Sequence, residues 1–148
     1  MENNLNLDQD IQQELFELSE LLNSGDFHEA LVNAQSLISR SKVSLNRASC
    51  HFILGCAMHE LGDSLGGLAN ILEALFMFPS DEPALCGNAQ FQIAKIQFDN
   101  SLLTSALFFV DLAIANFELL PQSEENFQII ERCNLLKIQI KERQTPMH

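Results

Sequence analysis

The same short pattern of small residues occurs three times along this chain, at nearly equal intervals. Residues 24–31 read "SGDFHEAL", residues 61–68 read "LGDSLGGL" and residues 100–107 read "NSLLTSAL". Gly62 follows Gly25 by 37 residues, and Ser101 follows Gly62 by 39 residues. Self-similarity at such a period indicates one supersecondary unit that is repeated and stacked. The chain must therefore fold so that each unit packs on its neighbours in the same way.

Each unit reads as two antiparallel helices joined by a tight turn. The stretch "LGCAMHELGDSLGGLANILEALFMFP", residues 54–79, has helical apolar spacing but contains four glycines. A glycine inside a helix costs roughly 1 kcal/mol relative to alanine. We expect Gly25 and Gly62 to take the left-handed backbone conformation of the turns. We expect Gly55 and Gly67 to lie where two helices cross, because side chains there would hold the helices apart.

The unit resembles the tetratricopeptide repeat, a pattern of aromatic, Leu-Gly, small, apolar and Pro positions over about 34 residues. The corresponding residues here, in the same order, are His51, Leu54, Gly55, Met58, Gly67, Ile71 and Pro79. The implied fold class is all-α, with three tetratricopeptide repeats and a C-terminal capping helix in a right-handed solenoid. We predict a single domain over residues 1–148.

The repeats are predicted at about 11–44, 48–81 and 87–120, and the capping helix at about 123–143. The six repeat helices are predicted near 8–23, 27–40, 47–61, 64–77, 84–99 and 103–118. Because the repeats are longer than the usual 34 residues, we place their extra residues in the turns between repeats, at 44–46 and 80–84. In the last helix, we expect the apolar residues to cover the end of the stack; these are Phe127, Ile130, Leu135 and Ile138.

Charge and cysteine usage exclude several function classes. With 20 acidic and 8 basic residues, the formal net charge is −12, which repels phosphate backbones and anionic lipids. We therefore expect no nucleic-acid and no membrane partner. "MENNLNLDQD" does not read as a signal peptide, and the apolar run 102–117 is too short to span a bilayer. The four cysteines have no CxxC spacing, so we predict reduced thiols in a cytoplasm.

The sequence gives no sign of catalysis. It contains no glycine-rich phosphate loop, no GxSxG and no HExxH. Cys56 and His59 are three residues apart, but a metal site would need two further ligands. His51 stands where the repeat normally packs a Trp, so we expect it in the core. We predict a protein that is not an enzyme and has no cofactor and no metal.

In this repeat, the first helix of each pair lines a concave groove through its second, fifth, ninth and twelfth residues. Here those positions are Gln12, Leu15, Ser19 and Leu22, then Ser49, Phe52, Cys56 and His59, then Asn88, Phe91, Lys95 and Phe98. The predicted peptide-binding residues among them are Leu15, Leu22, Phe52, Cys56, His59, Asn88, Phe91, Lys95 and Phe98. The alternative is that Phe52, Phe91 and Phe98 only fill the core of the repeats.

The composition of this groove predicts an apolar guest. Lys95 is its only cation, so a clamp for the acidic tails of heat-shock chaperones is improbable. An extended apolar segment fits better, with its backbone hydrogen-bonded to Gln12, Asn88 or His59. Three buried anchors would contribute roughly 5–9 kcal/mol before ordering costs of several kcal/mol, which predicts micromolar affinity. Tighter binding would need a second contact surface.

Over roughly residues 11–140, the chain resembles the class II chaperones of bacterial type III secretion. The segments that carry the resemblance are "FILGCAMHELGD", residues 52–63, and "DEPALCGNAQFQIAK", residues 81–95. The resemblance implies a bacterial cytoplasmic protein whose groove holds an extended segment of a secreted translocator or effector. The implied pocket residues are Leu15, Leu22, Phe52, Cys56, Phe91 and Phe98.

Two features depart from that family. Its grooves use tyrosines, and this chain has none. Its members usually begin with an extra helix that often serves for dimerisation, whereas only about ten residues precede the first repeat here. A homodimer is therefore an open alternative. The alternative function is a generic tetratricopeptide adaptor that scaffolds folded partners in a larger complex.

Overall fold

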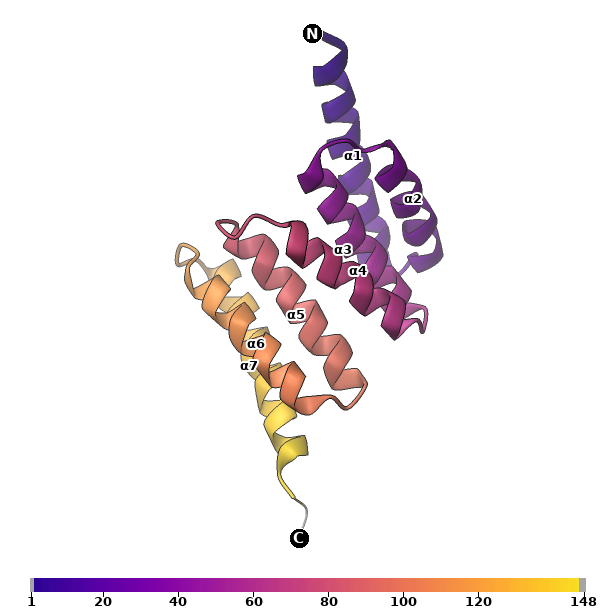
Figure 1. Ribbon diagram of the computed structural model, residues 1–148. Coiled ribbons are helices and arrows are strands. Elements are labelled where there is room, and N and C mark those ends of the chain that lie inside the picture. Colours follow the sequence, from indigo (N-terminus) through magenta and orange to yellow (C-terminus); the bar gives the residue numbers. More distant parts are fainter. Residues whose placement is uncertain (1, 147–148) are drawn as a thin grey trace. The chain divides into compact units, whose positions relative to one another are not determined.

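The computed structural model describes the backbone of residues 2–146 and the side chains of residues 9–146. This part of the chain contains seven α-helices (Figure 1): α1 (Glu2–Ser24), α2 (Phe27–Arg40), α3 (Ser44–Glu60), α4 (Ser64–Met77), α5 (Pro83–Asp99), α6 (Leu103–Glu118) and α7 (Glu124–Gln144). They divide into two compact units, Met1–Met77 with α1–α4 and Phe78–His148 with α5–α7. The prediction of an all-α fold of three helix pairs and a final helix is confirmed.

Two predicted boundaries are wrong. The first helix begins at Glu2 and not near residue 8, and residues 44–46 open α3 instead of forming a turn. Val43 has an extended backbone, so the chain turns before Ser44. Asn46 is buried, and its side-chain oxygen accepts a 2.9 Å hydrogen bond from Gln12 of α1, which anchors the first turn of α3. Most of the extra length of the repeats lies in α3 and α5, which have 17 residues each.

The three turns inside the helix pairs share one geometry. Gly25 and Gly62 have φ values of 85° and 97°, as predicted, and Ser101 has a φ of 62° at the third position. In each turn the next N–H donates to a carbonyl five residues earlier: Asp26 to Leu21, Asp63 to Met58 and Leu102 to Gln97, at 2.8–2.9 Å. This bond closes the last helical turn and satisfies a carbonyl that the helix leaves free. The third repeat therefore forms the same turn without a glycine.

Gly55 and Gly67 form the crossing of α3 and α4, as predicted. A Cβ atom on Gly55 would lie 2.7 Å from the carbonyl oxygen of Gly67 and 2.6 Å from Cγ1 of Ile71. A Cβ atom on Gly67 would lie 2.7 Å from the carbonyl oxygen of Gly55. The two backbones are therefore closer than any larger residue allows. The packing gained by this approach offsets the poor helix propensity of glycine.

The residues at the same two positions differ between the helix pairs. Counted back by 37 residues from Gly55 and Gly67 they are Leu18 and Ala30, and counted forward by 39 residues they are Ala94 and Ala106. All four are buried. The distance between two helix axes depends on the side chains at their contact. Leu18 is the largest of the six, so we expect α1 and α2 to be the most widely spaced pair.

Each unit has its own apolar core. The cluster of the first unit comprises Ile11, Leu18, Ala34, Leu37, Cys50, Ile53 and Leu54. The cluster of the second unit comprises Ala94, Ala106, Val110, Ala113, Phe117, Cys133, Leu136 and Ile140. Helix α7 closes the second core and is also joined to α6 by an ion pair of 2.7 Å between Lys137 and Asp111.

The predicted inward face of α7 is only partly correct. Ile130 packs against the core of the second unit, but Phe127, Leu135 and Ile138 are 66%, 57% and 53% exposed. The face that packs inward instead carries Cys133, Leu136 and Ile140, which are spaced by three and four residues. The three exposed residues are on the opposite side of the same helix, so apolar character alone did not identify its buried face.

We expect Gly55→Ala to lower the free energy of unfolding by about 1–3 kcal/mol, although alanine is the better helix former. The added methyl group meets a backbone oxygen, which cannot move without separating the helices. Gly66→Ala is the matched control, because the atoms nearest to its methyl group belong to the side chains of Asp63 and Met58 and not to a backbone. Urea unfolding measures both variants, and equal losses would contradict the proposed crossing constraint.

We expect Ser101→Gly to raise the free energy of unfolding by about 0.5–1 kcal/mol, because glycine takes a positive φ without steric cost. The matched control is Ser19→Gly, an exposed serine inside α1, where glycine should destabilise the helix by about 0.5 kcal/mol. Thermal unfolding gives both values. A loss of stability in Ser101→Gly would contradict the reading of Ser101 as a strained turn residue.

Candidate functional site

In the first unit, three predicted groove residues lie at the edge of the core. Leu15 and Leu22 of α1 and Phe52 of α3 are partly buried and pack against the core cluster of that unit. Part of each side chain contributes to the core and part remains accessible. Core filling, one of the two readings that the sequence left open for Phe52, is therefore observed, and contact of these residues with a client stays a prediction.

The two polar candidates of α3 are engaged within the protein. Nδ1 of His59 lies 2.9 Å from the hydroxyl oxygen of Ser64 at the start of α4. Cys56 is 8% exposed and lies among the buried residues of α3. His51, expected in the core, is half-buried, and its Nδ1 lies 3.0 Å from the side-chain oxygen of Asn70. A guest that binds His59 through Nδ1 must therefore compete with Ser64.

In the second unit, α5 carries four candidates in one row. Asn88 and Lys95 are exposed, whereas Phe91 and Phe98 are partly buried and pack against the core of this unit. The Lys95 ammonium lies 5.7 Å from the centre of the Phe91 ring. A cation over an exposed aromatic face contributes about 0.5–1 kcal/mol. This contact holds the one cation that the sequence assigned to the groove beside an apolar anchor.

Phe98 has a partner that the sequence reasoning missed. The guanidinium carbon of Arg143, near the end of α7, lies 4.2 Å from the centre of the Phe98 ring. Its Nη1 also donates a 3.3 Å hydrogen bond to the Phe98 carbonyl oxygen. The two residues are 45 positions apart, so no local pattern could pair them. Arg143 covers part of the ring, which makes Phe98 less open to a guest than its position in the repeat predicted.

The four cysteines are free thiols in buried positions. Burial, followed by the negative charge of Glu14, raises the pKa of the Cys50 thiol to about 11, and the positive charge of Arg40 partly opposes this rise. Burial likewise raises the pKa of Cys133 to about 11, partly opposed by a backbone hydrogen bond. Burial, followed by the charges of Glu82 and Asp81, raises the pKa of Cys86. Such thiols are poor nucleophiles near neutral pH, because the thiolate is the reactive form.

The described residues offer neither a metal-binding cluster nor a membrane-spanning helix. No three His, Cys, Asp or Glu side chains in that part of the chain lie close enough together to hold a metal ion. None of its helices has the length and the apolar character needed to cross a membrane.

Comparison with solved structures shows a similar fold. The chain matches the crystal structure of PcrH in complex with the chaperone binding region of PopD, with a TM-score of 0.75 and 17% sequence identity. The match covers 93% of this chain and 96% of PcrH. No family model and no curated protein matches the sequence.

PcrH is a tetratricopeptide class II translocator chaperone. The match therefore confirms the fold that the resemblance to this chaperone class implied. At 17% identity the likeness is one of fold, and the residues that contact a client in this chain remain a prediction.

We expect the free energy of unfolding to fall as the pH rises from about 9 to about 11. In this window the thiols of the unfolded chain lose their protons while Cys50 and Cys133 keep theirs, so the unfolded state binds fewer protons and gains stability. Urea titrations across the window measure the slope, and Cys50→Ala/Cys133→Ala should flatten it. An unchanged slope in the double variant would contradict this assignment.

Proposed function

We propose that the protein is a non-enzymatic chaperone that binds an extended apolar segment of a secreted client, a type III secretion translocator or effector, through the apolar residues predicted from the repeat pattern. The observation that carries the proposal is the fold shared, over 93% of the chain, with PcrH, whose crystal structure includes the chaperone binding region of PopD. The chaperone covers the client's apolar segment, and this prevents aggregation before export.

The partial burial of the candidate apolar side chains supports the proposal. Leu15, Leu22 and Phe52 in the first unit and Phe91 in the second are partly buried, so each is held in place by a core and still offers apolar surface. An apolar side chain held in this way loses little conformational freedom on binding, which lowers the cost of association. Each client side chain that is fully buried against such a surface contributes about 1.5–3 kcal/mol.

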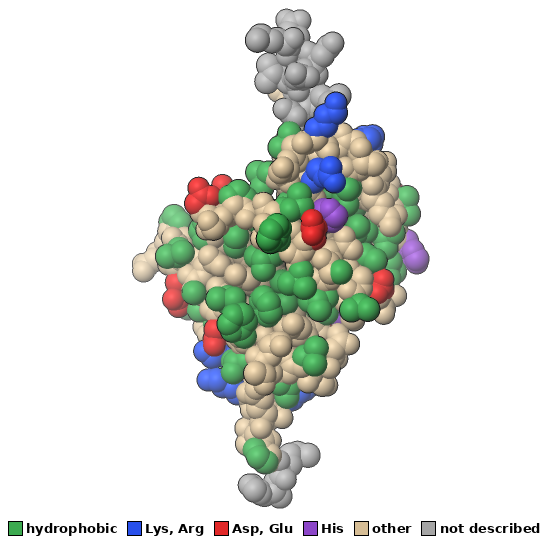
Figure 2. All heavy atoms as spheres, in the orientation of Figure 1, with side chains coloured by type: hydrophobic (Ala, Val, Ile, Leu, Met, Phe, Trp, Pro, Cys, Tyr) green, Lys and Arg blue, Asp and Glu red, His purple; other side chains and the backbone are tan. Residues whose placement is uncertain are grey.

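A second candidate function, an adaptor for folded partners, is favoured by the outer face of α4. Leu65, Leu72 and Phe76 lie on one side of this helix and are 81%, 40% and 89% exposed. Glu73 is the one charged residue of α4. A helix that is apolar on all sides is usually covered. Figure 2 shows hydrophobic side chains spread over the visible face of both units, with few acidic ones among them.

One experiment separates the two functions. The tagged protein is purified from its source organism, the protein that accompanies it is identified, and that partner is expressed with and without this chain. A chaperone client should be soluble only in co-expression, whereas a partner of an adaptor should be soluble alone. A partner that is soluble alone would refute the chaperone proposal.

We expect Phe52→Ala/Phe91→Ala to weaken binding of that client at least tenfold, because two apolar anchors are lost at about 1 kcal/mol or more each. The matched control is Phe16→Ala/Phe108→Ala, which removes two exposed rings, 61% and 60% accessible, from other positions. Calorimetric titration measures affinity, and circular dichroism confirms that both variants fold. Wild-type affinity in a folded Phe52→Ala/Phe91→Ala variant would contradict the proposed site.

A further inference from the structure

The outer face of α4 is apolar and exposed. Within the first unit α4 packs on α3, and its buried residues are Gly67, Ile71 and Ala74. The opposite side of the helix carries four exposed residues at spacings of four, three and four positions, which are Leu65, Ala69, Leu72 and Phe76. Leu65 and Phe76 are more exposed than any other large apolar side chain in the described part of the chain. These four residues form the α4 stripe.

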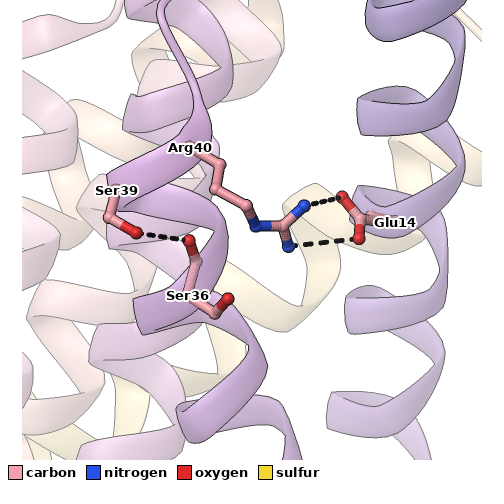
Figure 3. A network of polar contacts seen from close by, with 4 residues as sticks. All are labelled: Glu14, Ser36, Ser39 and Arg40. Atoms are coloured by element: carbon pink, nitrogen blue, oxygen red, sulfur yellow. Dashed lines mark hydrogen bonds and ion pairs between the residues drawn. The ribbon is translucent and has the colours of Figure 1, made fainter.

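The repeat does not require apolar residues at the positions of the α4 stripe. Counted back by 37 residues, the equivalent positions of α2 are also exposed, and they hold His28, Val32, Gln35 and Ser39. Counted forward by 39 residues, the exposed equivalents in α6 are Thr104, Phe108, Asp111 and Ala115. Ser39, the equivalent of Phe76, satisfies its hydroxyl within α2 by donating a 2.8 Å hydrogen bond to the Ser36 carbonyl oxygen (Figure 3). A continuous apolar stripe is therefore a feature of the middle helix pair and not of the fold.

The low charge of α4 permits a second copy of this chain as the occupant of the stripe. The chain has a net charge of −12, so two copies repel each other over most of their surfaces. Glu73 is the one charged residue of α4, which is fewer than in each of the other six helices that the structure describes. Two copies that meet along α4 therefore bring few like charges together.

The spacing of the α4 stripe is the same in both directions along the helix. When two such helices lie antiparallel, Leu65 is opposite Phe76 of the second copy, and Ala69 is opposite Leu72 of the second copy. In a contact with two-fold symmetry the same patch serves both subunits, so the patch must be complementary to itself. The small Ala69 side chain leaves a hole that the larger Leu72 side chain can enter as a knob. The order of large and small residues in the stripe meets this requirement.

The area of the α4 stripe limits the strength of such a contact. With about 150–250 Å² for a fully exposed phenylalanine and less for a leucine, the exposed parts of Leu65, Leu72 and Phe76 provide roughly 400 Å² per copy. Two copies therefore bury roughly 800 Å² through these side chains, and the flanking residues of α4 raise the total toward about 1,200 Å², the lower end of specific interfaces. This area fits a reversible dimer and not an obligate one.

We propose that the α4 stripe is the contact surface of a reversible homodimer, in which the α4 helices of two copies pack antiparallel about a two-fold axis. Leu65 and Phe76 anchor the two ends of the contact, and Ala69 and Leu72 pack at its centre. The site goes beyond the proposed chaperone function, because none of the predicted client-binding residues belongs to α4. A folded partner of another kind, as in the adaptor function, is the competing occupant of this face.

Sedimentation equilibrium of the full chain in reducing buffer, at about 5 to about 500 μM protein, measures the association of two copies. We expect a monomer–dimer equilibrium with a dissociation constant in the micromolar range. Raising salt from about 50 to about 300 mM should lower this constant, because it screens the repulsion between two acidic chains. Leu65→Gln/Phe76→Gln should raise it at least tenfold. Both side chains are exposed, so circular dichroism should show a folded variant.

Two further variants separate the proposed pairing from general stickiness. Phe16→Gln/Phe108→Gln removes two exposed rings from other helices and should change the dissociation constant less than about twofold. Ala69→Leu adds apolar surface, yet it should weaken the dimer at least about threefold, because the new side chain fills the space for Leu72 of the second copy.

Three results would each overturn the proposal: a chain that stays monomeric at the highest concentration, equal losses in the two glutamine variants, or a tighter dimer in Ala69→Leu. A monomeric chain whose binding to a purified folded partner is lost in Leu65→Gln/Phe76→Gln would assign the stripe to the adaptor function instead.

Discussion

The approach of the α3 and α4 backbones is the constraint on which the first unit depends. The Gly67 carbonyl oxygen occupies the space next to Gly55 in which any other residue would place a Cβ atom. This contact fixes how α3 lies on α4, and thereby which side of α3 faces the core and which side offers Phe52. The first pair has Leu18 at the equivalent position, and a groove lies between its two helices.

The proposed client surface is built from residues that also hold the cores together. Leu15 and Phe52 contact the first core, and Phe91 contacts the second. Such side chains are pre-positioned, since their rotamers are restricted before any guest arrives. The same arrangement limits which substitutions can report on binding, because an aspartate at these positions would also disturb a core. For this reason alanine variants with exposed phenylalanines as controls are the more informative design.

Much of the fold could be predicted because its physical requirements are local. Each turn needs a residue with a left-handed backbone and each close helix crossing needs small residues, so glycines recur in the sequence at regular intervals. Gly25 and Gly62 occupy the predicted turns, and Gly55 and Gly67 occupy the predicted crossing. The helical start at Glu2 and the opening of α3 at Ser44 could not be predicted, because no proline or glycine marks them.

The parts of the site that escaped prediction depend on contacts between distant residues. The stacking of Arg143 on Phe98 joins positions 45 residues apart, and the bridge between Glu14 and Arg40 joins positions 26 apart. Only the packing of the helices brings these side chains together. The inward face of α7 was misassigned because the helix carries apolar residues on two opposite sides. Which of these sides faces the core is determined by the packing of α7 against the neighbouring helices and not by its composition.

The four buried cysteines have a consequence for the covalent chemistry of the chain. Cys50 lies in the core of the first unit and Cys133 in that of the second, both inaccessible to solvent and protonated at neutral pH. Oxidants and foreign disulfides react with accessible thiolates. In the folded molecule, Cys50 and Cys133 are therefore shielded from oxidation and from thiol–disulfide exchange.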